Sequence, residues 1–343
     1  MTDKQQMFFR LALVAFVLAY AVVLMGAFTR IENAGLGCPD WPGCYGRVFA
    51  PTTPAQVEHA QHFAPQADIS PAKAWKEMIH RYMAGLLSIA ILAMAVVGMQ
   101  LQRRTHRARY LLPLVAVVLL VFQALLGMLT VTWKLNPLIV MGHLLGGLSI
   151  LSLLWWIILR EQRLFRSKPS TPLTRRLRWL ALLALVIVIA QIALGGWTSS
   201  NYAGLACPDF PTCQAQWWPQ MDFTSGFTLW HKLGVDYDGG VLSLAAATAV
   251  HMAHRLGALV TFVYVGGLAL YIIVAGGQDR LCRYGVLLLV ALLIQVTLGI
   301  LNVLTHLTVP IAEAHNGFAG FLLLSVLLLN HVVRPGAAAE AQS

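Results

Sequence analysis

Eight long apolar stretches constrain this chain more than any other feature of its sequence. Each is about 20 residues long, the length an α-helix needs to cross the hydrocarbon core of a bilayer. Hydrophobic residues make up 58% of the chain and charged residues only 11%, a balance that a water-soluble core cannot absorb. The sequence therefore predicts an all-α integral membrane protein with eight transmembrane helices. The predicted spans are residues 8–28, 77–101, 110–132, 138–159, 178–198, 248–275, 284–304 and 312–333.

The net charge of +10 is distributed unevenly between the loops. Sixteen of the 24 lysines and arginines lie at the N-terminus, in the turns 102–109, 160–178 and 279–283, and at Arg334. Membrane proteins concentrate basic residues on the cytoplasmic side. The pattern predicts that both termini are cytoplasmic and that the long loops 29–76 and 199–247 lie outside. The positive charge is thus explained by topology, and we expect no nucleic-acid partner.

The first apolar stretch has no small-residue cleavage site before Arg30, so we expect it to remain as a helix instead of acting as a removable signal. This favours a multi-pass protein of the bacterial cell (inner) membrane over an organelle protein, with membrane lipid as its solvent.

Four of the five cysteines form two pairs in the outer loops, Cys38 with Cys44 and Cys207 with Cys213. Disulfides form in oxidising compartments outside the cytoplasm. A separation of six positions, with Pro and Gly or Thr between the cysteines, can bring the two Cα atoms within the roughly 4.4–6.8 Å that a bridge needs. The spacing therefore predicts two disulfides.

The chain contains an internal duplication. The sequence Gly-Ala-Phe-Thr-Arg, followed by residues 34–44, recurs as Gly-Gly-Trp-Thr-Ser, followed by residues 203–213, at an offset of 169. Three further features recur in the same order. They are His80-Arg81 with His254-Arg255, Gln123-x-x-x-Gly127 with Gln295-x-x-x-Gly299, and His143 with His315. The duplication predicts two parallel four-helix-bundle repeats, residues 1–165 and 170–343, related by a pseudo-two-fold axis along the membrane normal.

Four of the repeated features are histidines near the outer ends of predicted helices: His80, His143, His254 and His315. Polar residues within a membrane are costly and usually functional. Two imidazoles on facing helices suit six-coordinate heme iron, so the duplication predicts one heme between each pair. Zinc or copper would require a tighter cluster with Cys or carboxylate ligands, and a proton relay remains an alternative for any single histidine. His251 and His306 have no histidine counterpart.

Charged residues accompany two of these histidines. Arg81 and Arg255 directly follow His80 and His254. Each arginine could bind a heme propionate or extend to a lipid phosphate. Glu77 lies three residues before His80, on the same helix face. It could act as a base beside a heme edge, or it could have no catalytic role and simply place a negative charge near the helix N-terminus, where such a charge is stabilising. Its counterpart in the second repeat is His251, which suggests that only one half carries out a reaction.

These residues together resemble the heme A synthase family. The resemblance rests on Glu77-Met-Ile-His80-Arg81, the Cys38–Cys44 segment, His143, His254-Arg255 and His315, and it covers about residues 8 to 333. It implies an oxidoreductase that oxidises a methyl group of heme O to a formyl group, giving heme A for terminal oxidases. Water is expected to supply the oxygen.

The resemblance also implies a role for each half. His80 and His143 would hold the substrate heme, with Glu77 as the catalytic carboxylate. His254 and His315 would hold a permanent heme b cofactor. Heme O synthase and an electron acceptor are the implied partners, and a homo-oligomer is left open. The Cys38–Cys44 pair resembles the pair linked to heme handling in the family.

Two other classes of protein must be weighed. A diheme b-type electron-transfer cytochrome would also need four histidines, but it gives no reason for a carboxylate beside only one heme. A transporter built on a parallel repeat should have broken helices and polar residues near the membrane midplane. Here the polar residues gather near the outer surface instead, which favours the synthase.

Overall fold

The computed structural model describes residues 2–65, 68–161, 172–230, 232–275 and 280–334. These residues are helical apart from loops and two isolated β-bridges. Eight of the helices are long and apolar enough to cross a membrane, as the sequence predicts. They are α1 (Asp3–Ile31), α3 (Pro71–Thr105), α4 (Leu112–Thr132), α5 (Pro137–Glu161), α6 (Pro172–Ser200), α8 (Leu244–Ala275), α9 (Arg280–Leu304) and α10 (Val309–Val332).

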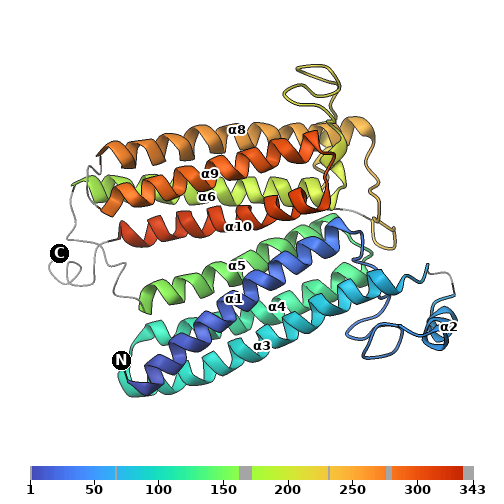
Figure 1. Cartoon of the computed structure of the whole chain (residues 1–343), viewed down its shortest axis with the longest axis horizontal. Helices are drawn as coiled ribbons and strands as arrows, with labels where there is room; N and C mark the ends of the chain where they lie inside the picture. Colours follow the sequence, from blue (N-terminus) through green and yellow to red (C-terminus); the bar gives the residue numbers. More distant parts are fainter. Residues whose placement is uncertain (1, 66–67, 162–171, 231, 276–279, 335–343) are drawn as a thin grey trace. The chain divides into compact units, whose positions relative to one another are not determined.

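The chain divides into two compact units. The first unit comprises Met1–Leu154, Ser199–Ala203 and Phe227–Ser243, and the second comprises Trp155–Thr198, Gly204–Gly226 and Leu244–Ser343. In the first, α1, α3, α4 and α5 lie side by side, and in the second, α6, α8, α9 and α10 do so (Figure 1). Each unit therefore takes most of its helices from one half of the sequence, and the first also takes two loop segments from the second half.

Helix α3 shows why the observed helices extend beyond the predicted spans. It begins at Pro71, whereas the apolar pattern begins at residue 77. The Ser70 side chain accepts a hydrogen bond from the Lys73 backbone N–H, and proline occupies the first helical turn. Both features favour a helix start, although the first two turns contain charged residues. These extra turns position Glu77 and His80 within a continuous helix.

The sequence of the two long loops also predicts short interfacial helices at residues 54–64 and 226–234. The first prediction is confirmed by α2 (Pro54–Phe63), which Thr53 and Gln56 stabilise through a capping box. The second is wrong, because the helix there is α7 (Phe223–Gly226), four residues long. Gly234 has a φ of +82°, a conformation that glycine adopts easily and that a right-handed helix cannot contain.

Segments 199–203 and 227–243 are attached to the first unit by specific contacts. The Arg30 guanidinium of α1 lies 3.7 Å from the centre of the Tyr202 ring and donates to the Ser199 carbonyl. The Tyr202 hydroxyl donates to Asp238, and the Tyr237 N–H donates to the Lys134 carbonyl at 3.1 Å. Cation–π and hydrogen-bond contacts therefore hold these loop segments on the first unit.

Candidate functional site

Each cysteine pair closes a small loop over the start of a long helix. Both predicted disulfides are present, with Cα–Cα distances of 4.8 Å for Cys38–Cys44 and 4.6 Å for Cys207–Cys213. In the first loop, Asp40 accepts hydrogen bonds from the backbone N–H groups of Tyr45 and Gly46, at 2.6 and 3.0 Å. The aspartate thereby satisfies donors of a turn in which Tyr45 has a φ of +52°.

The second loop repeats this arrangement. Asp209 accepts from the N–H groups of Gln214 and Ala215, at 2.6 and 3.1 Å. A hydrogen bond from the Thr212 hydroxyl, helped by these backbone donors, lowers the pKa of Asp209 below its usual value. In the first loop, burial and nearby carboxylates raise the pKa of the Tyr45 hydroxyl. The two loops thus share one backbone design, in which an aspartate accepts the N–H groups of the turn.

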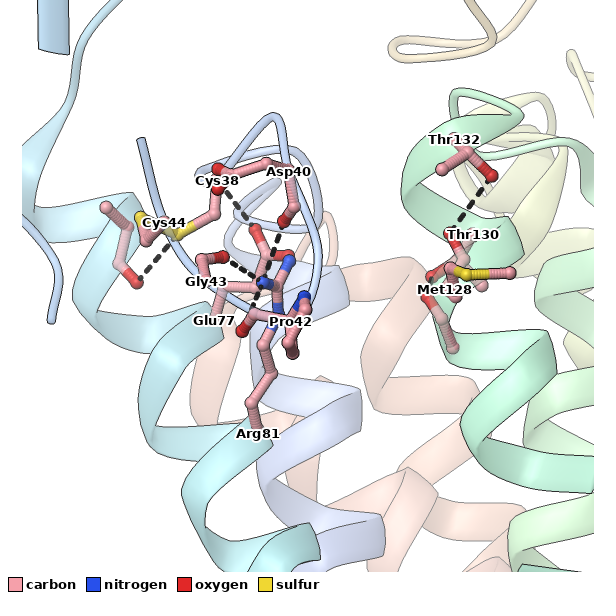
Figure 2. A network of polar contacts seen from close by, with 12 residues as sticks. Cys38, Asp40, Pro42, Gly43, Cys44, Glu77, Arg81, Met128, Thr130 and Thr132 are labelled. Carbon is pink, nitrogen blue, oxygen red and sulfur yellow. Dashed lines mark hydrogen bonds and ion pairs between the residues drawn. A yellow bond between two sulfur atoms is a disulfide. The ribbon is translucent and has the colours of Figure 1, made fainter. Parts of the chain in front are cut away.

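An arginine from the helix beneath binds the carbonyl groups of each loop. Arg81 of α3 donates to the carbonyl oxygens of Asp40, Pro42 and Gly43, which Figure 2 shows converging on its guanidinium. Arg255 of α8 donates to the carbonyls of the second loop at Cys207, Asp209 and Thr212. Heme propionate contacts for Arg81 and Arg255 stay a prediction: Arg81 binds the loop and Glu77, and Arg255 binds the loop through its two terminal nitrogens while its Nε has no partner among the described residues.

Glu77 is buried, with 4% of its surface exposed, yet it is fully engaged in contacts. One carboxylate oxygen accepts from the Cys38 N–H at 2.9 Å, and the other forms an ion pair with Arg81, one turn further along α3. Figure 2 shows the Glu77 side chain beneath the disulfide loop. The cysteine loop, the arginine and the carboxylate therefore form one connected network.

The second unit places His251 where the first has Glu77. The Cys207 N–H lies 3.4 Å from His251 Nδ1, just as the Cys38 N–H contacts Glu77. His251 is also buried, at 4% exposed. The correspondence inferred from sequence is therefore matched by equivalent contacts, and the exchange of carboxylate for imidazole is a real chemical difference between the units.

Each of the four repeated histidines lies against a glycine on a neighbouring helix. A Cβ added to Gly26 of α1 would lie 3.0 Å from His80 Nε2, and one on Gly127 of α4 would lie 3.3 Å from His143 Cε1. In the second unit, a Cβ on Gly195 or Gly299 would lie 3.0 Å from Cε1 of His254 or His315. All four imidazoles thus pack against helix backbone, and only glycine leaves room for this.

The two histidines of the first unit face one another. The ring centroids of His80 and His143 are 6.4 Å apart, with the ring planes at 88°. A metal–imidazole nitrogen bond is about 2.0 Å long, taking zinc as the guide, so this separation accommodates one metal atom between two rings. Both side chains are partly exposed, so protein atoms do not fill all the space around them.

The donor set fits heme better than a bare metal ion. The described residues include no group of three or more His, Cys, Asp or Glu side chains arranged to hold an ion. Paired imidazoles supply two axial ligands, and a porphyrin supplies the remaining four. His306 lies in the turn after α9 with a φ of +53° and has no described contact with the four histidines.

Sequence reasoning missed the glycine contacts and also Gln191, whose amide nitrogen lies 3.0 Å from His254 Nδ1. A signal for the glycines was present. Gly26 and Gly195 begin the two copies of the repeated pentapeptide, and Gly127 and Gly299 end the repeated Gln-x-x-x-Gly pattern. Only the structure shows what those glycines contact.

Eight apolar helices and histidines that pack in matched positions define a multi-pass membrane protein suited to heme chemistry. Residues 9–327 match the family described as cytochrome oxidase assembly protein. This match covers most of the chain, and the chain belongs to that family.

Curated relatives extend this finding. A heme A synthase of Shewanella oneidensis is 44% identical over 318 residues, which cover 93% of this chain and 94% of the relative. A heme A synthase of Geobacillus kaustophilus is 27% identical over 90% of this chain and 86% of the relative. One of Bacillus pumilus is 24% identical, over 88% and 87%. The likeness therefore extends across both units.

Proposed function

We propose that this chain oxidises a methyl group of heme O to a formyl group, producing heme A. Its family and its likeness to heme A synthases over nearly its whole length support this reaction. The structural observation that carries the proposal is Glu77, a buried carboxylate one turn from His80. The matching position of the second unit has His251 instead, so the two units are not equivalent electron carriers.

The histidine pairs take different groups in this proposal. His80 and His143 bind the iron of the substrate heme, and His254 and His315 bind a resident heme b. When bound, heme b supplies one-electron redox chemistry, which amino-acid side chains lack. The facing rings of His80 and His143, 6.4 Å apart, support the first assignment. The glycine contacts that His254 and His315 share with His80 and His143 support heme binding by the second pair as well.

The reaction sets the task of the protein groups. Conversion of a methyl group and one water to a formyl group releases four protons and four electrons, and the electrons pass to an external acceptor. Glu77 accepts protons from the reacting carbon or from the attacking water. The Cys38 N–H and Arg81 hold both carboxylate oxygens in place, so the base is positioned before substrate arrives.

The two units are parallel repeats in a bacterial inner membrane in this proposal. Their matched disulfide loops, arginine contacts and glycine–histidine contacts support a common ancestor for both. The cytoplasmic position of both termini rests on the distribution of lysine and arginine. The disulfides and the four histidines would then lie toward the outer side.

A conversion assay tests the function. Membranes from a host that makes heme O but no heme A are compared with and without this chain, and their extracted hemes are separated and weighed by mass spectrometry. We expect heme A, with its hydroxylated intermediate, only where the chain is present. Heme O alone in both samples, with the chain folded and in the membrane, contradicts the proposal.

A further inference from the structure

The second unit contacts the imidazoles of its histidines with glutamine amides. The Nε2 atom of Gln191, in α6, lies 3.0 Å from His254 Nδ1 and 3.0 Å from the His254 carbonyl oxygen. The Nε2 atom of Gln295, in α9, lies 3.4 Å from each of the two ring nitrogens of His315. Gln191 is four residues before Gly195, so the amide and the glycine contact the same imidazole from one face of α6.

The first unit lacks these contacts. The residue corresponding to Gln191 is Val22, four residues before Gly26, and valine can offer no hydrogen bond. Gln123 corresponds to Gln295, but its amide lies against Gly146, where an added Cβ would be 1.8 Å from Nε2. Within the described part of the chain, His143 Nδ1 and Gln123 Nε2 have no hydrogen-bond partner.

The two units also differ on the helix that faces the second glutamine. Gly146, three residues after His143, leaves space that the Gln123 amide occupies. Phe318 stands at the corresponding position, three residues after His315, and its ring packs 6.0 Å from the Phe321 ring. The Gln191 amide also lies against a glycine, since a Cβ on Gly257 would be 2.3 Å from its oxygen, and it still contacts His254.

A hydrogen bond to the nitrogen that does not bind metal fixes the rotation of an imidazole and strengthens it as a ligand. Which atom of the amide faces the ring is assigned by the hydrogen-bond network, since oxygen and nitrogen look alike. Were His254 to hold iron through Nε2, its Nδ1–H would donate to the Gln191 amide oxygen once the amide turned over, in exchange for the present contact with the His254 carbonyl. That hydrogen bond would restrain the His254 ring, whereas Val22, which stands at the place of Gln191, can offer none to His80.

We propose that Gln191, assisted by Gln295, is a positioning residue that makes the second unit a permanent heme site, and that Val22 keeps the first unit exchangeable. The proposal rests on the proposed function, which assigns resident heme to the second unit and substrate heme to the first. It accounts for how two duplicated sites can hold closely related porphyrins for very different times.

The experiment measures heme release from the purified, heme-loaded chain to an excess of apomyoglobin, together with the midpoint potential of heme b. Gln191→Leu keeps the side-chain length but removes the hydrogen bond, and we expect release of heme b to be roughly tenfold faster. Gln191→Glu retains an acceptor for Nδ1–H, so it should restore slow release and lower the midpoint potential. Gln123→Leu, in the first unit, is the matched control and should leave heme b unchanged.

The converse variant, Val22→Gln, should slow release of the first-unit heme, a gain that misfolding cannot produce. Heme b that leaves Gln191→Leu as slowly as wild type, with an unchanged potential, overturns the inference while leaving the proposed function standing. Wild-type protein that converts heme O yet releases both hemes at one rate also overturns it. Wild-type protein that binds no heme contradicts the proposed function itself.

Discussion

Glu77 and His251 occupy matching places but offer different chemistry. Both accept or share the N–H of a disulfide-bonded cysteine, at 2.9 and 3.4 Å. A carboxylate held by an arginine is a negative charge that can accept a proton, whereas an imidazole one turn from Arg255 carries no such charge when neutral. The two units thus have similar frames that differ at this position in offering a carboxylate or an imidazole to the cysteine N–H.

Replacing Glu77 with alanine should abolish conversion and leave heme binding intact. A positioned general base contributes roughly 100-fold or more to a rate, so heme A formation should fall by at least about that factor. The absorption spectrum of the bound hemes should be retained, because neither histidine pair is altered. Heme A formed at the wild-type rate would remove Glu77 from the mechanism.

The glycine contacts predict steric sensitivity at particular positions. Gly195→Ala places a Cβ 3.0 Å from His254 Cε1, so the ring must shift and the b-type heme spectrum should weaken. Gly267→Ala in α8 is the control, because a Cβ there meets nothing within 4 Å. It should keep the spectrum and stabilise the helix by about 1 kcal/mol. Equal heme content in both variants would refute the steric account.

At the level of elements, the disulfide loops depend on the helices beneath them. Arg255 supplies three hydrogen bonds to carbonyl oxygens of the second loop, at 2.7 to 3.0 Å. Arg81 does the same in the first loop while pairing with Glu77. Each loop is therefore held both by its disulfide and by an arginine of the helix next to it. The conformation of the loop is thereby linked to the residues of the candidate site.

Arg255→Ala should loosen the second loop. A hydrogen bond to a charged group contributes about 1.5–3 kcal/mol, so the free energy of local opening should fall on the order of 2 kcal/mol. Hydrogen exchange of the amides at residues 207–216 measures this directly. Arg175→Ala, at an exposed position of α6, should leave those amides unchanged. Unaltered exchange in Arg255→Ala would show that the disulfide alone orders the loop.

Sequence patterns predicted these elements unevenly. The apolar runs gave all eight long helices, because a membrane span leaves a signal about 20 residues long. The start of α3 at Pro71 was hidden, since Lys73, Lys76 and Glu77 interrupt the apolar pattern. The disulfides followed from cysteine spacing. The binding of Arg81 and Arg255 to loop carbonyls could not be predicted, because backbone acceptors leave no mark on the sequence.

At the scale of the whole molecule, the even number of membrane-length helices in each half determines the topology. Four membrane-length helices in each half return the chain to the side from which it entered, so both halves begin on the same side. The excess of lysine and arginine at the N-terminus and in the turn 102–109 predicts that this side is the cytoplasm. The sequence did not predict that the loop segment 227–243 belongs to the first unit, because this depends on contacts between residues that are distant along the chain.

Reporter fusions test this topology. A cytoplasmic reporter should be active when fused after His106, and a reporter that requires an oxidising compartment should be active after Glu58 or Asp236. Stable disulfides are rare in the cytoplasm, so the Cys38–Cys44 bridge favours the same orientation. The reverse pattern of reporter activity would invert the chain and contradict the predicted side of the disulfide loops.

The central claim, that paired histidines in each unit hold heme, is tested most directly by acid–acetone extraction of pigment from the purified protein, followed by chromatography and mass determination. We predict heme b together with a farnesylated heme, either heme O, its hydroxylated form or heme A. Protein that is folded and carries no heme would contradict the account of the four histidines.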